Sequence, residues 1–162
     1  MADTIAAIAT GAQVAAIGII RISGPEALPI IDRLFRPASG RLMSEYEDRK
    51  LIYGRLTDRG GELLDLCLCT VSRAPHSYTG EDTAELQCHG SPTVLRVALE
   101  ELFRVGARQA LPGEFTKRAF LNGRMELSSA EAVADIIDAE SIECAKNAAA
   151  QLSGAVAVKA DN

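Results

Sequence analysis

The sequence lacks the features that mark membrane and secreted proteins. None of its apolar runs is long enough to span a bilayer, and its start, Met1-Ala-Asp-Thr-Ile, has no basic segment of the kind found in signal peptides. We therefore expect a cytoplasmic protein with no membrane contact. In a reducing cytoplasm, the four cysteines are expected to be free thiols.

Motifs for familiar catalytic chemistry are missing as well. The sequence has no G-x4-G-K-[ST] P-loop, no G-x-G-x-x-G, and no arrangement typical of a serine or cysteine nucleophile. Cys67, Cys69, Cys88 and His89 are residue types that can bind zinc. However, Cys67 and Cys69 form a C-x-C motif with no matched second pair, so the cysteines are more typical of thiols in the core than of zinc ligands. His89 precedes a glycine and is more typical of a structural hydrogen bond than of a general base. We predict no catalytic residue and no metal ligand.

Basic residues are outnumbered overall but concentrated in one stretch. The formal net charge of −5 argues against a general nucleic-acid or membrane surface, so such contacts would need a local basic patch. The stretch 112–124 holds three bases and one acid, whereas the next nineteen residues, 125–143, carry six acids and no base. Its charged residues are Glu114, Lys117, Arg118 and Arg124. This basic turn is a candidate anion contact.

Hydrophobic periodicity predicts mixed strands and helices in the first two thirds of the chain. The first helix is expected to begin at Pro25, with Ser23 or Gly24 as its cap. A hairpin turn is expected at residues 58–61. The predicted strands cover residues 4–10, 17–23, 51–57, 63–72 and 83–88, with a short one near Arg108; the helices cover residues 25–35 and 92–105, and residues 37–50 form a loop.

Only helix is predicted after about residue 111. A short helix covers 114–121, and a long one covers 128–152, with Ser128 and Glu131 as a capping box and Gly154 as its stop. The apolar stripe of the long helix comprises Ala130, Val133, Ala134, Ile137, Cys144, Ala145 and Ala148. The chain is thus predicted to be α+β, a mixed β-sheet with flanking helices over residues 1–121, followed by the first part of a helical domain at 122–162.

Polar residues on two predicted strands are candidate ligand contacts. Arg21 fits an exposed strand face or ion pair equally well, but its planar fork also suits a ligand carboxylate. Glu85 fits a solvated strand face, or a contact with a heterocycle that presents two adjacent N–H donors, such as a guanine or pterin edge. Glu81 and Asp82 are more typical of residues that end a loop and form side-chain hydrogen bonds than of two ligands of one metal ion.

Six ungapped blocks of the sequence are specific enough to compare with known families. They are Asp3-Thr-Ile-Ala-Ala, Gly18-Ile-Ile-Arg-Ile-Ser-Gly-Pro, Ser77-Tyr-Thr-Gly-Glu-Asp, Glu85-Leu-Gln-Cys-His-Gly, Pro112-Gly-Glu-Phe-Thr-Lys-Arg-Ala-Phe-Leu-Asn-Gly and Ala130-Glu-Ala-Val-Ala-Asp-Ile-Ile-Asp-Ala. Together they resemble the N-terminal part of the MnmE (TrmE) family of tRNA-modification GTPases, and the similarity runs in order from Asp3 to Gly154.

The resemblance implies a function that composition does not show. Members of this family bind a tetrahydrofolate derivative, either the 5-formyl or the 5,10-methylene form, through a domain similar to the tetrahydrofolate-binding domain of aminomethyltransferases. That domain also mediates homodimerisation. The folate is expected to supply the one-carbon unit for modification of the wobble uridine (U34) of tRNA, together with the flavoprotein MnmG (GidA). GTP, Mg²⁺ and K⁺ are bound by a GTPase domain absent from this chain.

The resemblance assigns three folate contacts: Arg21, Glu85 and Arg124, the last where the family has a lysine. Ile20 and Leu86 are expected only to frame the ring. The chain departs from the family at residues 11–16, where Gly-Ala-Gln-Val-Ala-Ala replaces a glycine-rich basic loop. Whether it is a truncated or a stand-alone protein is left open.

Three functions remain open at this stage. The favoured one is a folate-binding and dimerisation module of a tRNA-modifying GTPase. The alternative is a structural dimerisation module that has lost folate binding, as the altered 11–16 loop and Arg124 would allow. An independent aminomethyltransferase-like enzyme is disfavoured because no catalytic constellation is present.

Overall fold

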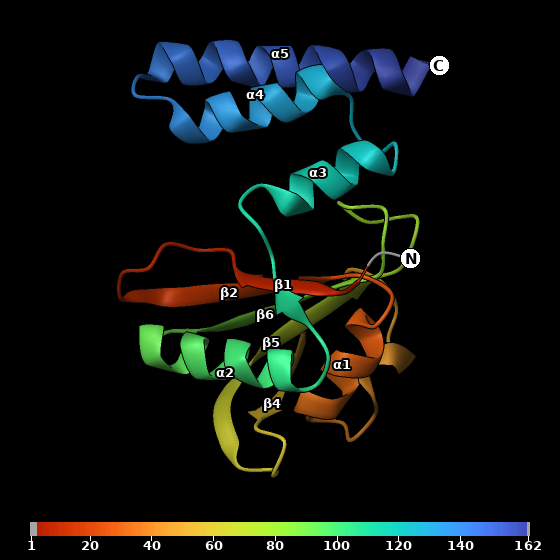
Figure 1. Ribbon diagram of the computed structural model, residues 1–162, viewed down its shortest axis with the longest axis vertical. Helices are drawn as coiled ribbons and strands as arrows, with labels where there is room; N and C mark the ends of the chain where they lie inside the picture. Colours follow the sequence, from red (N-terminus) through yellow and green to blue (C-terminus); the bar gives the residue numbers. More distant parts are fainter. Residues whose placement is uncertain (1–2, 162) are drawn as a thin grey trace. The chain divides into compact units, whose positions relative to one another are not determined.

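The computed structural model describes the backbone of residues 3–161 and the side chains of residues 3–154. The chain folds into two compact units (Figure 1). The first unit comprises residues 1–77 and 81–112, and the second comprises residues 78–80 and 113–162. The contacts thus divide the chain after Pro112, whereas the sequence suggested a boundary at residue 121. The two units are described separately below.

The first unit is built on a seven-stranded mixed sheet with the strand order β3-β4-β5-β6-β2-β1-β7. Only β1 and β7 pair in parallel; the other neighbours are antiparallel. The α+β class predicted from the sequence is confirmed. The strands are β1 (Ile5–Ile8), β2 (Ala15–Ser23), β3 (Phe35–Pro37), β4 (Ile52–Thr57), β5 (Leu63–Ser72), β6 (Thr83–Gly90) and β7 (Arg108–Gln109).

Alternation along the central strands creates two different sheet faces. Ile20 in β2 and Leu86 in β6 are fully buried, and they belong to the hydrophobic core together with residues of α1 (Ala27–Leu34) and α2 (Pro92–Arg104). Both helices lie on this face of the sheet (Figure 1). Because successive strand residues point to opposite faces, Arg21 and Glu85 lie on the other one, which we call the outer face.

The start of α1 differs from the sequence-based prediction. Its N-cap is Glu26, and neither Ser23 nor Gly24 caps the helix. The Glu26 N–H instead donates to Thr4 Oγ1 at 2.9 Å. Gly24 has a φ of 140°, and a Cβ there would lie 2.5 Å from Thr4 Cα, so this position requires glycine for the close approach of β1.

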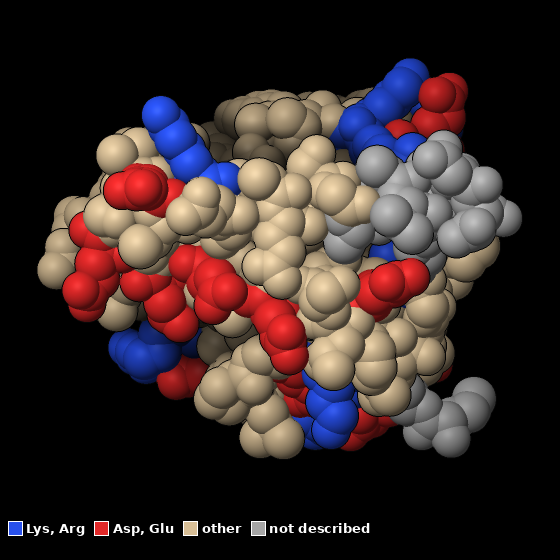
Figure 2. Space-filling view, turned by 90° about the horizontal axis from the view of Figure 1, so that it is seen from above, with Lys and Arg blue, Asp and Glu red and all other residues tan. Residues whose placement is uncertain are grey.

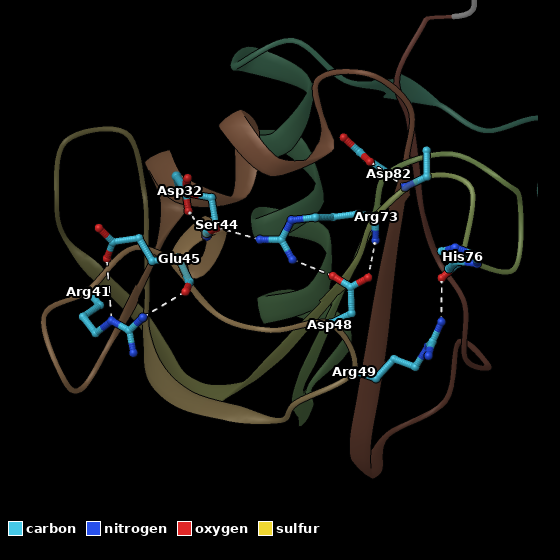
Figure 3. Close-up of polar contacts among 10 residues, drawn as sticks. Asp32, Arg41, Ser44, Glu45, Asp48, Arg49, Arg73, His76 and Asp82 are labelled. Carbon is cyan, nitrogen blue, oxygen red and sulfur yellow. Dashed lines mark hydrogen bonds and ion pairs between the residues drawn. The ribbon is translucent and has the colours of Figure 1, made fainter.

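A polar network anchors the connection between β3 and β4 (Figure 3). This connection includes a short 3-10 helix, η1 (Met43–Glu45), with Met43 fully buried. Arg73, at the end of β5, donates from Nη1 to Asp48 Oδ1 at 2.5 Å and from Nη2 to the Ser44 carbonyl at 2.6 Å. Burial acts to raise the pKa of Asp48, but the hydrogen bonds from Arg73 outweigh it and hold that pKa below its ordinary value.

The second unit contains α3 (Glu114–Leu121), α4 (Leu127–Asp138) and α5 (Ile142–Asp161). The prediction of one helix over 128–152 was wrong, because the backbone of Ala139 is extended and ends α4. Ser141 then caps α5, its Oγ accepting from the Cys144 N–H at 3.1 Å. α4 and α5 lie side by side and run in opposite directions (Figure 1).

Three further details of the predicted long helix also need correction. The N-cap of α4 is Glu126, and no side-chain capping bond forms there, so Ser128 and Glu131 make no capping box. Gly154 lies within α5 and does not end it. The predicted stripe is only partly buried: Ala148 is buried and Ala130, Val133 and Ala145 are half-buried, whereas Ala134, Ile137 and Cys144 are exposed, Ile137 at 76%. The other buried residues of α4 and of the described side chains of α5 are Ser129 and Ala132. Among the described residues, no helix combines the length and apolar character needed to cross a membrane.

Candidate functional site

The outer face brings Arg21 and Glu85 together. They occupy directly opposed positions on the neighbouring strands β2 and β6. Arg21 Nε donates to Glu85 Oε1 at 3.0 Å, and the two side chains are 31% and 30% exposed. The pair is therefore fixed by the strand register yet remains reachable from solvent. Ile20 and Leu86, which were expected to frame a ligand ring, are on the buried face and cannot do so.

A hollow of about 350 Å³ opens on the same unit, next to this pair along the strands. Gln87 lies two residues along β6 from Glu85, on the same face, and pairs with Leu68 of β5 and Ile19 of β2. The hollow is lined by Ala16, Ile17, Tyr53, Leu66, Cys67, Leu68, Gln87, Cys88 and His89. Its volume and its mixture of apolar walls with a few polar groups are typical of small-molecule sites.

Arg124 belongs to the second unit. It follows α3, and its N–H donates to the Ala119 carbonyl at 2.8 Å, which closes the turn after the helix. The segment 78–80 packs against this turn. The Asn122 side chain donates to the Thr79 carbonyl at 2.8 Å, and a Cβ on Gly80 would lie 3.1 Å from Arg124 Cγ. Gly80 has a φ of 80°, so glycine is favoured there by conformation as well as by space.

The other bases of the predicted basic turn have different environments. Arg118 on α3 is only 7% exposed, and its Nη2 lies 3.4 Å from Glu114 Oε2, one turn earlier. This pairing gives Arg118 a structural role in the helix. Arg118 is thus engaged within α3, whereas Lys117 and Arg124 are both exposed.

Most of the remaining polar candidates hold the structure together. Glu81 Oε1 accepts from Ser23 Oγ at 2.9 Å, and Asp82 Oδ1 accepts from the Ala74 N–H at 2.8 Å, as expected for residues that end a loop. His89 Nδ1 lies 2.7 Å from Asp65 Oδ1, which confirms a structural hydrogen bond for His89.

The cysteines of the strands are core thiols, as predicted. Cys67, Cys69 and Cys88 are at most 5% exposed. The hydrogen bond with Cys88 and burial raise the pKa of the Cys67 thiol, and burial raises that of Cys69. Asp65 was not predicted from the sequence as a functional residue. No motif marks it, and only the strand register brings it beside Cys67 and Cys88.

A larger cleft, of about 480 Å³, lies within the second unit between α4 and α5. Asp135, Asp138 and Glu140 line this cleft. Acidic side chains also gather on part of the surface seen from above (Figure 2). The charge of the three residues in the cleft disfavours anionic ligands, including the carboxylates of a folate and the phosphates of RNA. The hollow on the first unit is therefore the better candidate site for such a ligand.

Comparison with known proteins places these features in a family. Residues 4–124 match the family model described as "GTP-binding protein TrmE N-terminus". The chain is 51% identical over 154 residues to the tRNA modification GTPase MnmE of Symbiobacterium thermophilum, covering 95% of this chain and 34% of that protein. It is 52% identical over 153 residues to the protein of the same name from Bacteroides fragilis, covering 94% and 32%. The chain thus spans about a third of the length of these curated relatives.

Proposed function

Since the chain belongs to the family of tRNA modification GTPases MnmE and matches the N-terminal part of its members, we propose that it binds a tetrahydrofolate derivative and forms a homodimer. In this role it would position the one-carbon donor for modification of the wobble uridine (U34) of tRNA. The observation that carries the proposal is the Arg21–Glu85 pair on the outer face, beside a hollow of ligand size.

Glu85 is suited to the amidine edge of a pterin. A carboxylate offers about four lone-pair positions, and the bond from Arg21 Nε uses only one of them. Two adjacent N–H groups can therefore bind Glu85 in the bidentate manner that makes charge-assisted recognition specific. Arg21 holds the Glu85 carboxylate in place before a ligand arrives, which lowers the entropic cost of binding.

The hollow supplies the apolar surface that a fused heterocycle needs. Ile17, Leu66 and Leu68 form apolar walls, and Tyr53 adds an aromatic ring. Gln87 contributes an amide that can both donate and accept hydrogen bonds. Arg21 is the cation of this unit proposed for folate oxygens, because a guanidinium pairs well with planar oxygen acceptors. Arg124, in the second unit, is proposed as a further folate contact from the family resemblance alone.

Exposed apolar side chains on the first unit support the homodimer. Ile17, Tyr53 and Leu66 are 57%, 53% and 40% exposed, and all three line the hollow. A group of large exposed apolar residues marks a candidate protein contact. Ligand binding and dimerisation would then share the outer face.

The wider activity is proposed for the longer protein of which this chain would form the N-terminal part. That protein would hydrolyse GTP in a separate domain that binds GTP, Mg²⁺ and K⁺. It would act on tRNA in the cytoplasm together with the flavoprotein MnmG. We assign no catalytic residue to the present chain.

A second candidate function is a dimerisation module that does not bind folate. The Arg21–Glu85 hydrogen bond favours it, because the two residues satisfy each other without any ligand, as in a structural ion pair. The two functions differ in one measurable property, saturable folate binding.

A titration with 5-formyltetrahydrofolate tests the proposal. The purified chain, its Glu85→Gln variant and an Arg96→Ala control would be titrated calorimetrically. Arg96 is a matched control because it is an exposed arginine paired with Glu100 on α2. Hydrogen bonds to charged groups contribute about 1.5–3 kcal/mol, so Glu85→Gln is expected to weaken binding roughly tenfold to a hundredfold.

The outcomes separate the alternatives. Saturable binding that depends on Glu85 and is indifferent to Arg96 supports the folate site. A folded dimer with no saturable binding would establish the purely structural module. Binding of equal strength in wild-type and Glu85→Gln chains would show that the ligand binds elsewhere.

A further inference from the structure

Asp65, Cys67 and Cys88 form a cluster of potential metal ligands. Cys67 and Cys88 also line the hollow, but none of the three is a proposed folate contact. The carboxylate oxygen and the two sulfurs lie within 4.8 Å of one another. Among the residues with described side chains, this is the one group of three or more such ligands in reach of one another. Cys67 and Cys88 are 5% and 2% exposed, and the Asp65 side chain is 11% exposed, so the cluster is almost completely shielded from water.

The strand geometry explains why Asp65 faces the two thiols. The ladder between β5 and β6 ends at the pair Leu68–Gln87, and beyond it β5 pairs with β4 while β6 pairs with β2. Asp65 spans the resulting gap. Its Oδ2 accepts from the His89 backbone N–H at 2.9 Å, in place of a ladder carbonyl, and its Oδ1 lies 2.7 Å from His89 Nδ1.

We propose that Asp65, Cys67 and Cys88 bind one divalent transition-metal ion of the zinc class, with the fourth coordination position open. Two thiolates and a carboxylate make a donor set that zinc accepts, and three protein ligands with one open position are typical of non-structural zinc sites. In a tetrahedral site, neighbouring ligand atoms lie roughly 3.3–3.8 Å apart, so a contraction of about 1 Å is sufficient to form it.

The hydrogen bonds around Asp65 favour this arrangement. Ligating carboxylates are commonly oriented by further hydrogen bonds, and here the backbone and ring of His89 hold both oxygens of Asp65. The Cys67 and Cys88 thiols are free and are hydrogen-bonded to each other. A bound ion replaces their two protons, which are released to solvent, and the two thiolates with Asp65 then offset its charge.

Cys69 and Cys144 provide matched controls within the same chain. Cys69 lies two residues from Cys67 on the same strand and is equally buried, but it is not in the cluster. Cys144 is exposed in the second unit. A nonspecific thiol–metal interaction would involve these residues, whereas the proposed site would not.

Cobalt(II) is a suitable probe because thiolate coordination gives it a charge-transfer absorption. The reduced, metal-free chain would be titrated with Co²⁺, and zinc would then be added as a competitor. We expect one equivalent of Co²⁺ to bind with a thiolate-to-metal band that zinc abolishes. Cys67→Ser and Cys88→Ser should weaken binding more than tenfold, whereas Cys69→Ser and Cys144→Ser should leave it unchanged.

Asp65→Asn distinguishes the loss of a metal ligand from a failure of the variant to fold. The substitution keeps the shape of the side chain but removes its charge, and we expect at least tenfold weaker Co²⁺ binding with an unchanged far-UV circular dichroism spectrum. The absence of a charge-transfer band in the wild-type chain would overturn the proposal. A band that survives Cys67→Ser and Cys88→Ser, or one that is lost in Cys69→Ser, would overturn it equally.

Discussion

At the residue scale, the arginine at position 124 is the departure from the family with the clearest expected effect on folate binding. The resemblance places a lysine at this position, and the arginine keeps the charge while changing its shape. We predict that Arg124→Ala lowers the affinity for 5-formyltetrahydrofolate roughly tenfold to a hundredfold, the range for hydrogen bonds to charged groups. Arg124→Lys should retain most of the affinity. Calorimetric titration of both variants measures this, and an unaffected Arg124→Ala variant would remove Arg124 from the site.

The ion pair between Asp48 and Arg73 gives a pH-dependent contribution to stability. Because the folded protein lowers the pKa of Asp48, the contribution is present above the unfolded-state pKa and is lost as the pH falls through the folded-state pKa. An unfolded aspartate has a pKa of about 3.9. The loss is therefore expected below about pH 4.

Urea unfolding of the wild-type chain and Asp48→Asn at several pH values tests this prediction. The wild-type chain should be the more stable of the two at neutral pH, and the difference should shrink as the pH falls below about 4. A difference that stays constant over this range would contradict the prediction, because it would show that the stability difference does not depend on ionisation of Asp48.

At the scale of elements, the break between α4 and α5 is the main departure from the sequence-based prediction. Residues 128–151 contain neither proline nor glycine, so nothing in the local sequence required a break. The two helices pack against each other in opposite directions, and Ser141 supplies the cap that the second helix needs. Tertiary packing therefore overrode helix propensity.

The cap can be tested with two serines of the same segment. Ser141→Ala removes the bond to the Cys144 N–H and should lower the free energy of unfolding of the helical unit by about 1 kcal/mol. Ser128→Ala is the control, since α4 has no side-chain cap, and its effect should stay within about 0.5 kcal/mol. Chemical unfolding followed by circular dichroism measures both. Equal effects of the two substitutions would contradict the assigned cap.

Other elements could be predicted closely because local signals determine them. The bounds of α3 match the prediction, since the Pro112-Gly113 and Asn122-Gly123 pairs delimit the helix. The alternation in β2 and β6 correctly placed Arg21 and Glu85 opposite the apolar neighbours on their own strands. The sequence could not reveal that they bond each other or that Asp65 faces Cys88, because strand register depends on pairings distant in the chain.

At the scale of the whole molecule, the proposed dimer determines how the exposed apolar surface is used. Leu66→Asp places a charge on the outer face and should weaken self-association at least tenfold, because a buried unpaired charge is costly. Leu127→Asp is the control, since Leu127 is 59% exposed but lies in the second unit. Sedimentation velocity over a concentration series distinguishes the two. A wild-type chain that stays monomeric would contradict the proposed dimer.

The metal and folate proposals can be tested independently. Asp65 and the two thiols are separate from Glu85, so Glu85→Gln should leave Co²⁺ binding unchanged. Conversely, Cys88→Ser removes a ligand of the proposed metal site without touching the Arg21–Glu85 pair. Loss of both activities in Glu85→Gln would indicate a general structural defect, whereas loss of both in Cys88→Ser would show that the two sites are coupled, because Cys88 also lines the hollow.

The most direct test of the central claim is a crystal structure of the chain with 5-formyltetrahydrofolate. We expect the pterin in the hollow beside Gln87, with two of its N–H groups within hydrogen-bond distance of the Glu85 carboxylate. Arg21 should contact either Glu85 or the ligand oxygens. A pterin bound in the acidic cleft between α4 and α5, or one whose amidine edge makes no contact with Glu85, would contradict it.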